Sequence, residues 1–356
     1  MSEQNILLFV GSYAEKEEAG VHVYSLNCKE GTFTAVDQAA GMKNPTFVNV
    51  DAAKRKLYAI AETTTGSGDR TGEVVTFDIA NEGQLTELSR ATTIQPTASH
   101  VQRDSNSKYL IFSGYHGGNV GLLTIEGQGE AGKLVDEQIH QGHGAEPSRQ
   151  DRPHPHSTLA TPDNKYILVA DLGLDLVKVY ALDQENNKLI FHSEAATPPG
   201  AGPRHMAFHP NGKFVYSINE VNSTITAFAY DESKGQLTAL ETVSTLPAGF
   251  TGENLTAEIA ITPDGLNLYG SNRGHDSIVH FKIDTTTGEL SLIGHVSTEG
   301  GHPRHFAVTP AGKHLIVANR DSNNLTLFTI DDQGKPSYTG HSVTVSKPVC
   351  VQPIVL

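Results

Sequence analysis

The sequence has 356 residues, of which 37% are hydrophobic, with 34 glycines, 17 prolines and no tryptophan. Its 26 Lys and Arg against 40 Asp and Glu give a net charge of −14, which argues against nucleic acid and anionic membranes as partners because like charges repel. A chain of this length can bury a large core, and the frequent Gly and Pro predict many short strands joined by turns.

The start of the chain and its cysteines indicate the compartment. The first residues, MSEQNILLFVGSY, have no basic segment and only a short apolar run, so we expect no signal peptide. No stretch of 18 apolar residues occurs in the sequence. Cys28 and Cys350 are too few for a disulfide framework, and we expect them to be free buried thiols. We therefore expect a soluble, cytoplasmic protein whose oligomeric state the sequence leaves open.

One twelve-residue pattern recurs six times along the chain. Each copy opens with a turn of Asp, Pro, Asn or Gly type and continues as a strand of apolar, β-branched or aromatic residues. A short strand precedes each copy and begins near a marker position that is often Pro. A third strand, a polar turn and a fourth strand follow. The copies and their markers are DAAKRKLYAIAE (51–62) with Pro45, DSNSKYLIFSGY (104–115) with Ala98, TPDNKYILVADL (161–172) with Pro155, HPNGKFVYSINE (209–220) with Pro203, TPDGLNLYGSNR (262–273) with Thr256, and TPAGKHLIVANR (309–320) with Pro303.

This repeat predicts a β-propeller. Four strands in roughly 45–57 residues is the period of a propeller blade, and the lack of tryptophan argues against the Trp-Asp repeat class. The two chain ends supply a seventh blade, because residues 6–13 match the second strand and residues 347–356, with Pro348 as marker, supply the missing first strand. The C-terminal strand would then close the ring without an open sheet edge. We expect an all-β, seven-bladed propeller with four antiparallel strands per blade, nearly without helix, as a single domain over residues 1–356.

Three sets of residues should meet at one mouth of the central channel. In a blade, the innermost strand begins on the face of the ring where the second strand ends. The long irregular stretches 63–72, 141–153 and 246–256 are expected on the same side, where loops of this length usually carry function. The sets are Thr46, Ser99, His156, Arg204, Ala257, Arg304 and Val349, one residue past the marker; Phe47, His100, Ser157, His205, Glu258, His305 and Cys350, two past it; and Tyr13, Glu62, Tyr115, Leu172, Glu220, Arg273 and Arg320, at the segment ends.

Recurrence separates scaffold candidates from functional ones only in part. His205 and His305 recur in equivalent places, as do Arg204 and Arg304, so each of them fits a structural role as well as a functional one. Residues that interrupt the repeat favour function: Glu258 replaces His, His156 replaces Arg, and Glu220 faces Arg273 and Arg320. His154 should point away from its alternating partner His156, and Glu62 fits a salt bridge at the rim.

Three segments resemble a known family. HPHSTLATPDNKYILVADLG (154–173), GPRHMAFHPNGKFVYSINE (202–220) and NLTAEIAITPDGLNLYGSNRGHDSI (254–278) are similar to the lactonase family of seven-bladed propellers. That family includes bacterial 6-phosphogluconolactonases and fungal carboxy-cis,cis-muconate cyclases, and the resemblance covers essentially the whole chain. It implies a lactone hydrolase, with 6-phospho-glucono-1,5-lactone of the pentose phosphate route as the expected substrate.

The resemblance also implies site residues. A His, two Arg and a Glu in the channel of the muconate-cyclising relatives correspond by motif to His156, Arg204, Arg273 and Glu220. We expect the base to be Glu220, His156 or His205, and the arginines to bind an anionic lactone. The catalytic candidates are Glu220, His156 and Arg273, and the substrate-binding candidates are Arg204, His205, Glu258, His305 and Arg320.

Residue chemistry supports this expectation and leaves alternatives. Guanidinium groups bind carboxylate or phosphate, and lactone hydrolysis needs a base for water and a donor at the oxyanion. The sequence has no Gly-x-Ser-x-Gly motif for a serine nucleophile, and no His-Glu-x-x-His, Cys-pair or EF-hand motif, so we expect no metal and no cofactor. A cycloisomerase or lactonase for another carboxylated lactone, and a non-catalytic propeller that binds a partner on its rim, remain the alternatives.

Overall fold

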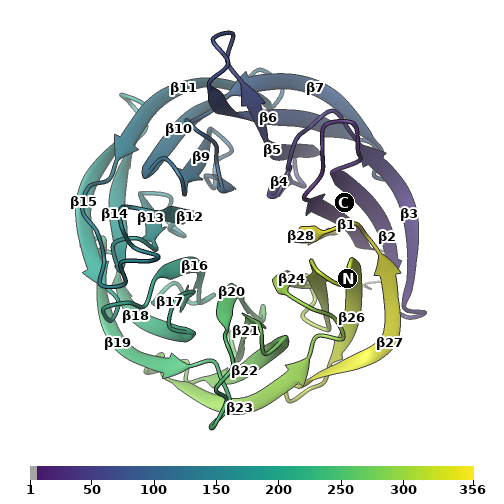
Figure 1. Cartoon of the computed structure of the whole chain (residues 1–356), viewed down its shortest axis with the longest axis vertical. Helices are drawn as coiled ribbons and strands as arrows, with labels where there is room; N and C mark the ends of the chain where they lie inside the picture. Colours follow the sequence, from purple (N-terminus) through teal and green to yellow (C-terminus); the bar gives the residue numbers. More distant parts are fainter. Residues whose placement is uncertain (1–5) are drawn as a thin grey trace.

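The computed structural model describes residues 6–356, which form 28 strands in seven four-stranded antiparallel sheets and no helix. Figure 1 shows the sheets arranged radially around a central channel. The predicted seven-bladed, all-β propeller is confirmed. In order from the channel outwards, the blades are β28 (Pro348–Ile354), β1 (Ile6–Ser12), β2 (Val21–Asn27) and β3 (Thr32–Ala39); β4 (Val48–Asp51), β5 (Lys56–Thr64), β6 (Arg70–Ile79) and β7 (Leu85–Thr92); β8 (His100–Arg103), β9 (Tyr109–Gly114), β10 (Asn119–Glu126) and β11 (Glu130–Ile139); β12 (Pro155–Ala160), β13 (Tyr166–Asp171), β14 (Leu176–Asp183) and β15 (Lys188–Ala196); β16 (Pro203–Phe208), β17 (Phe214–Asn219), β18 (Thr224–Asp231) and β19 (Gln236–Ser244); β20 (Leu255–Ile261), β21 (Asn267–Arg273), β22 (Ser277–Ile283) and β23 (Leu290–Ser297); and β24 (Pro303–Val308), β25 (His314–Asn319), β26 (Asn324–Ile330) and β27 (Pro336–Thr344).

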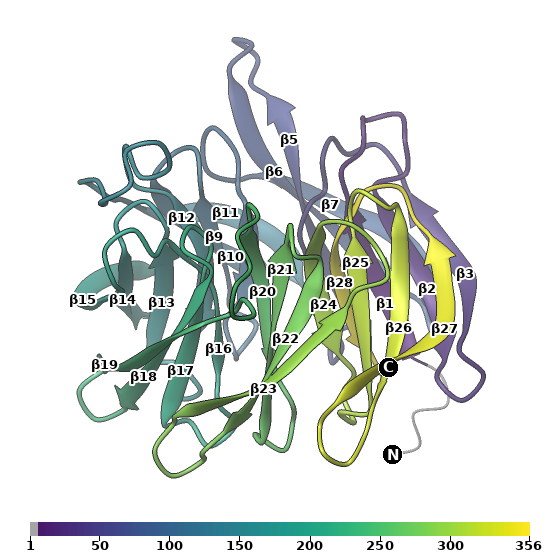
Figure 2. The same cartoon turned by 60° about the horizontal axis from the view of Figure 1, so that its bottom comes forward.

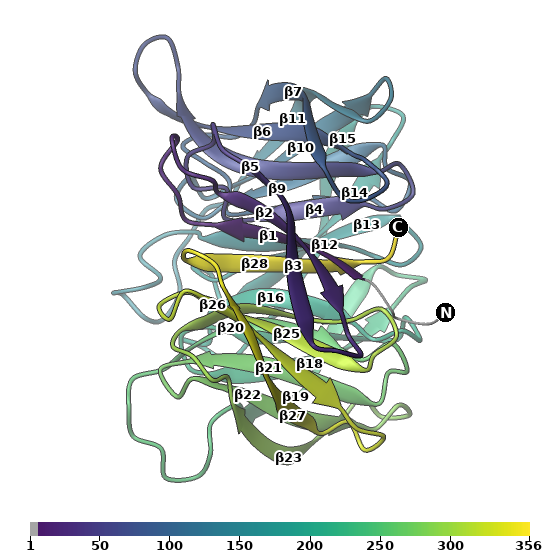
Figure 3. The same ribbon diagram turned by 90° about the vertical axis from the view of Figure 1, so that its right-hand side faces the viewer.

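The C-terminal strand completes the first blade. Strand β28 pairs antiparallel with β1, from Leu7 opposite Ile354 to Gly11 opposite Cys350. Figure 3 shows the two ends of the chain side by side in this sheet. The pairing joins the last blade to the first through a shared sheet, so the ring is closed as the sequence predicted.

The blades are joined by buried tyrosines at one repeated position. Tyr58, Tyr216 and Tyr269 lie at the centre of the second strands, and each donates a hydrogen bond from its hydroxyl group to a main-chain carbonyl in the outer turn of the next blade. The acceptors are glycines 129, 288 and 334, at 2.6–2.9 Å. Second strands are buried on both faces because neighbouring sheets pack face to face, whereas the outermost strands expose alternate residues.

One stretch that we expected to be irregular is regular. Residues 63–72 were expected to form a loop, but β5 runs to Thr64 and β6 begins at Arg70, so only residues 65–69 make the turn. Strand pairing continues from Glu62 opposite Gly72 to Thr64 opposite Arg70, and β-branched threonines favour that extension. Figure 2 shows this hairpin rising above the ring. Residues 141–153 and 246–254 do lack strands.

Two expectations concern the compartment. The expected absence of a signal peptide depends in part on residues 1–5, which lie outside the described residues. Within residues 6–356, the structure contains no helix with the length and apolar character needed to span a bilayer.

Candidate active site

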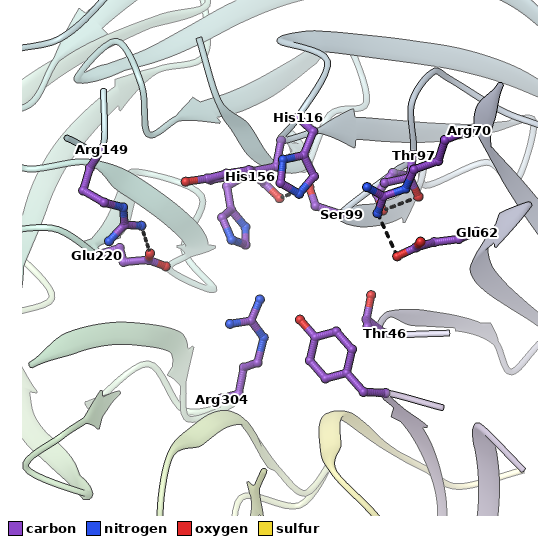
Figure 4. A pocket seen from close by; sticks show the side chains of 13 residues that line it. Thr46, Glu62, Arg70, Thr97, Ser99, His116, Arg149, His156, Glu220 and Arg304 are labelled. Atoms are coloured by element: carbon purple, nitrogen blue, oxygen red, sulfur yellow. Dashed lines mark hydrogen bonds and ion pairs between the residues drawn. The ribbon is translucent and has the colours of Figure 1, made fainter. Parts of the chain in front are cut away.

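A cavity of about 270 Å³ opens at one mouth of the channel. Figure 4 shows polar side chains converging on it from several blades. The cavity lies where the sequence placed the meeting point of first-strand starts and second-strand ends, and the 141–153 loop adds one residue. Its lining residues are Tyr13, Thr46, Glu62, Arg70, Thr97, Ala98, Ser99, Tyr115, His116, Arg149, His156, Glu220 and Arg304.

A repeated irregularity at the start of the inner strands re-aims the side chains at the mouth. In β12, Pro155 pairs with Asp171 but Ser157 pairs with Ala170, so His156 is an extra residue in the ladder. The same shift makes Arg204 the extra residue in β16 and Arg304 the extra residue in β24. An extra residue bends the strand locally and releases its side chain from strict alternation. Consecutive residues of one strand therefore reach the mouth and the channel below it.

Glu220 is the centre of an arginine cluster. Its Oε2 accepts hydrogen bonds from Nε of Arg204 at 3.0 Å and from Nη2 of Arg273 at 2.7 Å, and its Oε1 accepts one from Arg149. Glu220, Arg204 and Arg273 are only 5%, 3% and 6% exposed. Burial alone would raise the pKa of Glu220, but the three guanidinium charges outweigh it and hold the pKa far below its usual range. Glu220 is therefore a firmly ionised carboxylate and a weak proton acceptor.

Arg204 and Arg273 have few N–H groups left for a ligand. Arg204 also donates from Nη1 to the carbonyl of Ala257 at 2.6 Å, and Arg273 donates to the carbonyls of Thr256 at 2.5 Å and Leu255 at 3.3 Å. Burial, with the charges of Arg304 and Arg273, lowers the pKa of Arg204 to about 9. Neither arginine lines the cavity. Their hydrogen bonds hold Glu220 and the start of β20 in place.

His156 is a neutral imidazole at the wall of the cavity. Burial, followed by the charges of Arg204 and His205, lowers its pKa well below the usual value. Its Nδ1 is buried without a hydrogen-bond partner among the described residues. Its main-chain carbonyl accepts hydrogen bonds from the hydroxyl groups of Ser99 and Ser113 at 3.3 and 2.8 Å, which fix the strand. The ring nitrogens thus remain open to a proton at neutral pH.

A layer of histidines fills the channel beneath the mouth. Glu258 Oε2 lies 2.9 Å from His205 Nδ1 and 3.0 Å from His305 Nε2. The rings of His100 and His205 pack 5.4 Å apart, and Phe47 packs against both. Burial raises the pKa of Glu258, against the opposing effect of His305, and burial lowers the pKa of His305 to about 4. A smaller cavity of about 90 Å³ lies against these side chains.

The structure separates the predicted site residues into three groups. His156 and Glu220 line the mouth cavity, Arg204 and Arg273 hold Glu220, and His205, Glu258 and His305 form the layer beneath. Arg320 does not face Glu220 as expected. Its Nε donates to Asp321 at 2.6 Å because the turn after β25 brings the neighbouring carboxylate next to it.

Two secondary expectations concern the rim. The side chain of His154 stacks on the ring of Tyr115 and its Nδ1 lies 2.7 Å from the Tyr115 carbonyl oxygen, away from the cavity lining. Glu62 forms the salt bridge that we expected at the rim, with Arg70 at 2.9 Å.

Several lining residues were not selected from the sequence. Arg149 lies in the 141–153 loop and Arg70 in the 63–72 stretch, and both stretches were singled out by length alone. His116 follows a segment end by one residue. The path of a loop depends on contacts with other blades, so loop length was the only signal in the sequence for these residues. Within residues 6–356, no group of three or more His, Cys, Asp or Glu side chains is arranged to hold a metal ion.

Comparisons with known proteins agree with this architecture. Residues 7–353 match the family model described as lactonase, 7-bladed beta-propeller. The chain is 33% identical to 6-phosphogluconolactonase of Bacillus subtilis over 346 residues, which cover 97% of each protein. It is also 33% identical to 6-phosphogluconolactonase of Formosa agariphila over 331 residues, or 91% of this chain and 92% of that protein. The periplasmic gluconolactonase of Pseudomonas aeruginosa has a similar structure, with a TM-score of 0.89 and 30% identity over 99% of both chains. The chain therefore belongs to the lactonase family of seven-bladed β-propellers.

Proposed function

We propose that this protein is a lactone hydrolase that converts 6-phospho-glucono-1,5-lactone and water to 6-phosphogluconate. The observation that carries the proposal is a neutral imidazole, His156, at the wall of a cavity rich in arginines. The names of the Bacillus and Formosa relatives support the substrate class. The proposal includes the pentose phosphate pathway, a cytoplasmic location, a small anionic lactone as ligand and no cofactor.

His156 is the proposed general base. It takes a proton from a water molecule as the water oxygen attacks the lactone carbonyl carbon, and it returns that proton to the ring oxygen as the carbon–oxygen bond breaks. Such general base catalysis contributes about 10²–10⁴-fold in rate. The side chain suits this role because it is neutral and its Nδ1 is unbonded.

The other candidates for the base suit different roles. Glu220 accepts hydrogen bonds from three arginines, so protonation would break the cluster that it holds together. We assign Glu220, Arg204 and Arg273 to positioning within the site. His205 is bound to Glu258 in the layer beneath the cavity, and we assign it, with His305, to the support of His156. The His156 and His205 rings pack edge to face at 5.1 Å.

A rate assay tests the proposal. Freshly generated 6-phosphogluconolactone and unphosphorylated glucono-1,5-lactone are mixed with the protein, and acid release is followed in a pH-stat against spontaneous hydrolysis. We expect hydrolysis of the phosphorylated lactone by the wild type, and a fall of about 10²–10⁴-fold in His156→Asn, which keeps the size of the side chain but cannot take the proton. His192→Gln, on the outermost strand β15, is the matched control and should keep the wild-type rate. Wild-type rates equal to the spontaneous rates for both lactones would overturn the proposal.

A further inference from the structure

Arg304 differs from the other arginines of the mouth in its partners. Three arginines line the cavity, and two of them are paired: Arg70 with Glu62 at 2.9 Å, and Arg149 with Glu220. Arg304 has no carboxylate within salt-bridge distance among residues 6–356. Its nearest recorded neighbour of this kind is the ring of Tyr13, whose centroid lies 6.0 Å from the guanidinium carbon.

The repeat explains why Arg304 is unpaired. In the fifth blade, Arg204 bonds Glu220, which lies sixteen residues later at the end of the second strand. In the seventh blade, Arg304 occupies the place of Arg204, but the residue sixteen positions later is Arg320. Arg320 bonds Asp321 instead. The scaffold that satisfies one arginine therefore leaves its repeat-mate with a free charge at the cavity.

The free guanidinium lies opposite the proposed base. Figure 4 shows the side chains of Arg304 and His156 pointing toward each other across the cavity. The charge of Arg304 is also one of those that lower the pKa of His156, after burial and the effects of Arg204 and His205. A carbonyl group placed between the two side chains would have the base on one side and a cation on the other.

We propose that Arg304 is the anion-binding residue of the cavity, and that in catalysis it stabilises the oxyanion formed from the lactone carbonyl. This assignment rests on the proposed lactone hydrolysis. When the water oxygen bonds to the carbonyl carbon, the carbonyl π electrons move to its oxygen, and Arg304 N–H groups donate hydrogen bonds to that oxygen. When the C=O bond re-forms, the bond to the ring oxygen breaks, and the ring oxygen takes the proton held by His156. Arg204 and Arg273 are less suited because their N–H groups are committed to Glu220 and to main-chain carbonyls.

Kinetics of Arg304 variants test the assignment on both lactones. We expect Arg304→Gln to lower kcat by about 10²–10³-fold on the phosphorylated and the unphosphorylated lactone alike, as for loss of one oxyanion donor. Arg304→Lys should retain part of the rate because it keeps the charge. Added guanidinium ion should partly restore Arg304→Ala. The matched control is Arg55→Gln, which removes the same charge from the turn before β5, at the end of that strand opposite the mouth, where Arg55 bonds Asn81.

Two kinetic results would overturn the oxyanion role. The first is an unchanged kcat in Arg304→Gln. The second is a rise in KM for the phosphorylated lactone alone, with normal kinetics on glucono-1,5-lactone, which would make Arg304 the phosphate-binding residue.

A binding measurement separates this proposal from the proposed function. If the wild type hydrolyses neither lactone, the proposed function fails, and calorimetric titration with gluconate and 6-phosphogluconate decides the role of Arg304. Binding to the wild type that weakens at least about tenfold in Arg304→Gln supports the anion-binding role, because each tenfold change corresponds to about 1.4 kcal/mol, near the strength of a charged hydrogen bond. Equal affinities, or no binding to the wild type, would overturn it.

Discussion

Replacement of Glu220 by Gln should destabilise the protein strongly. The carboxylate neutralises part of the charge of three arginines, and the side chains of Arg204 and Arg273 are only 3% and 4% exposed, so they cannot turn to solvent. Removing one partner of a buried ion pair costs about 3–5 kcal/mol because it leaves an uncompensated buried charge. Unfolding entropy of about 2.1 cal/mol/K per residue gives about 0.75 kcal/mol/K for this chain, so Tm should fall by about 4–7 °C.

Calorimetric unfolding at several pH values measures this effect. The pKa of Glu220 is lowered in the folded protein, so its stabilisation is complete well above the unfolded pKa of about 4.3 and is lost as the pH falls through the folded pKa. The Tm difference between wild type and Glu220→Gln should therefore be constant near neutral pH and shrink below about pH 4.

The control for this prediction is Glu87→Gln. Glu87 also bonds an arginine, Arg90, but its side chain is 44% exposed, so the cost should stay below about 1 kcal/mol. Equal Tm values for Glu220→Gln and Glu87→Gln at neutral pH would refute the reasoning. So would a Tm difference for Glu220→Gln that grows in acid.

Two further predictions concern the base and the ring closure. Burial lowers the pKa of His156 well below its usual value, so enzyme-dependent kcat/KM should stay flat from about pH 8 down to about pH 6. A pH–rate profile with a midpoint near the usual histidine pKa would contradict this. Deletion of residues 348–356 removes β28 and exposes the edge of β1, so we expect aggregated protein by size-exclusion chromatography. A soluble, folded monomer would show that the shared sheet is dispensable.

The fold and the location of the site could be predicted because both follow from periodicity. A strand repeat with turn residues at fixed places specifies blades, and the match between residues 347–356 and the missing first strand specified how the ring closes. Radial packing then brings equivalent positions of every blade to the same mouth. That is why His156 and Glu220, far apart in the sequence, could be placed together in advance.

The partners of each charge were decided by the tertiary structure. Arg304 and Arg204 occupy the same place in the repeat, yet one is free and the other is bound to Glu220. Arg149 completes the cluster from a loop whose path the sequence does not encode locally. The extra residues in the inner strands also re-aim side chains that simple alternation would have sent elsewhere. Periodicity determines which strands are neighbours, but hydrogen-bond partners depend on ångström-scale side-chain positions set by contacts between blades.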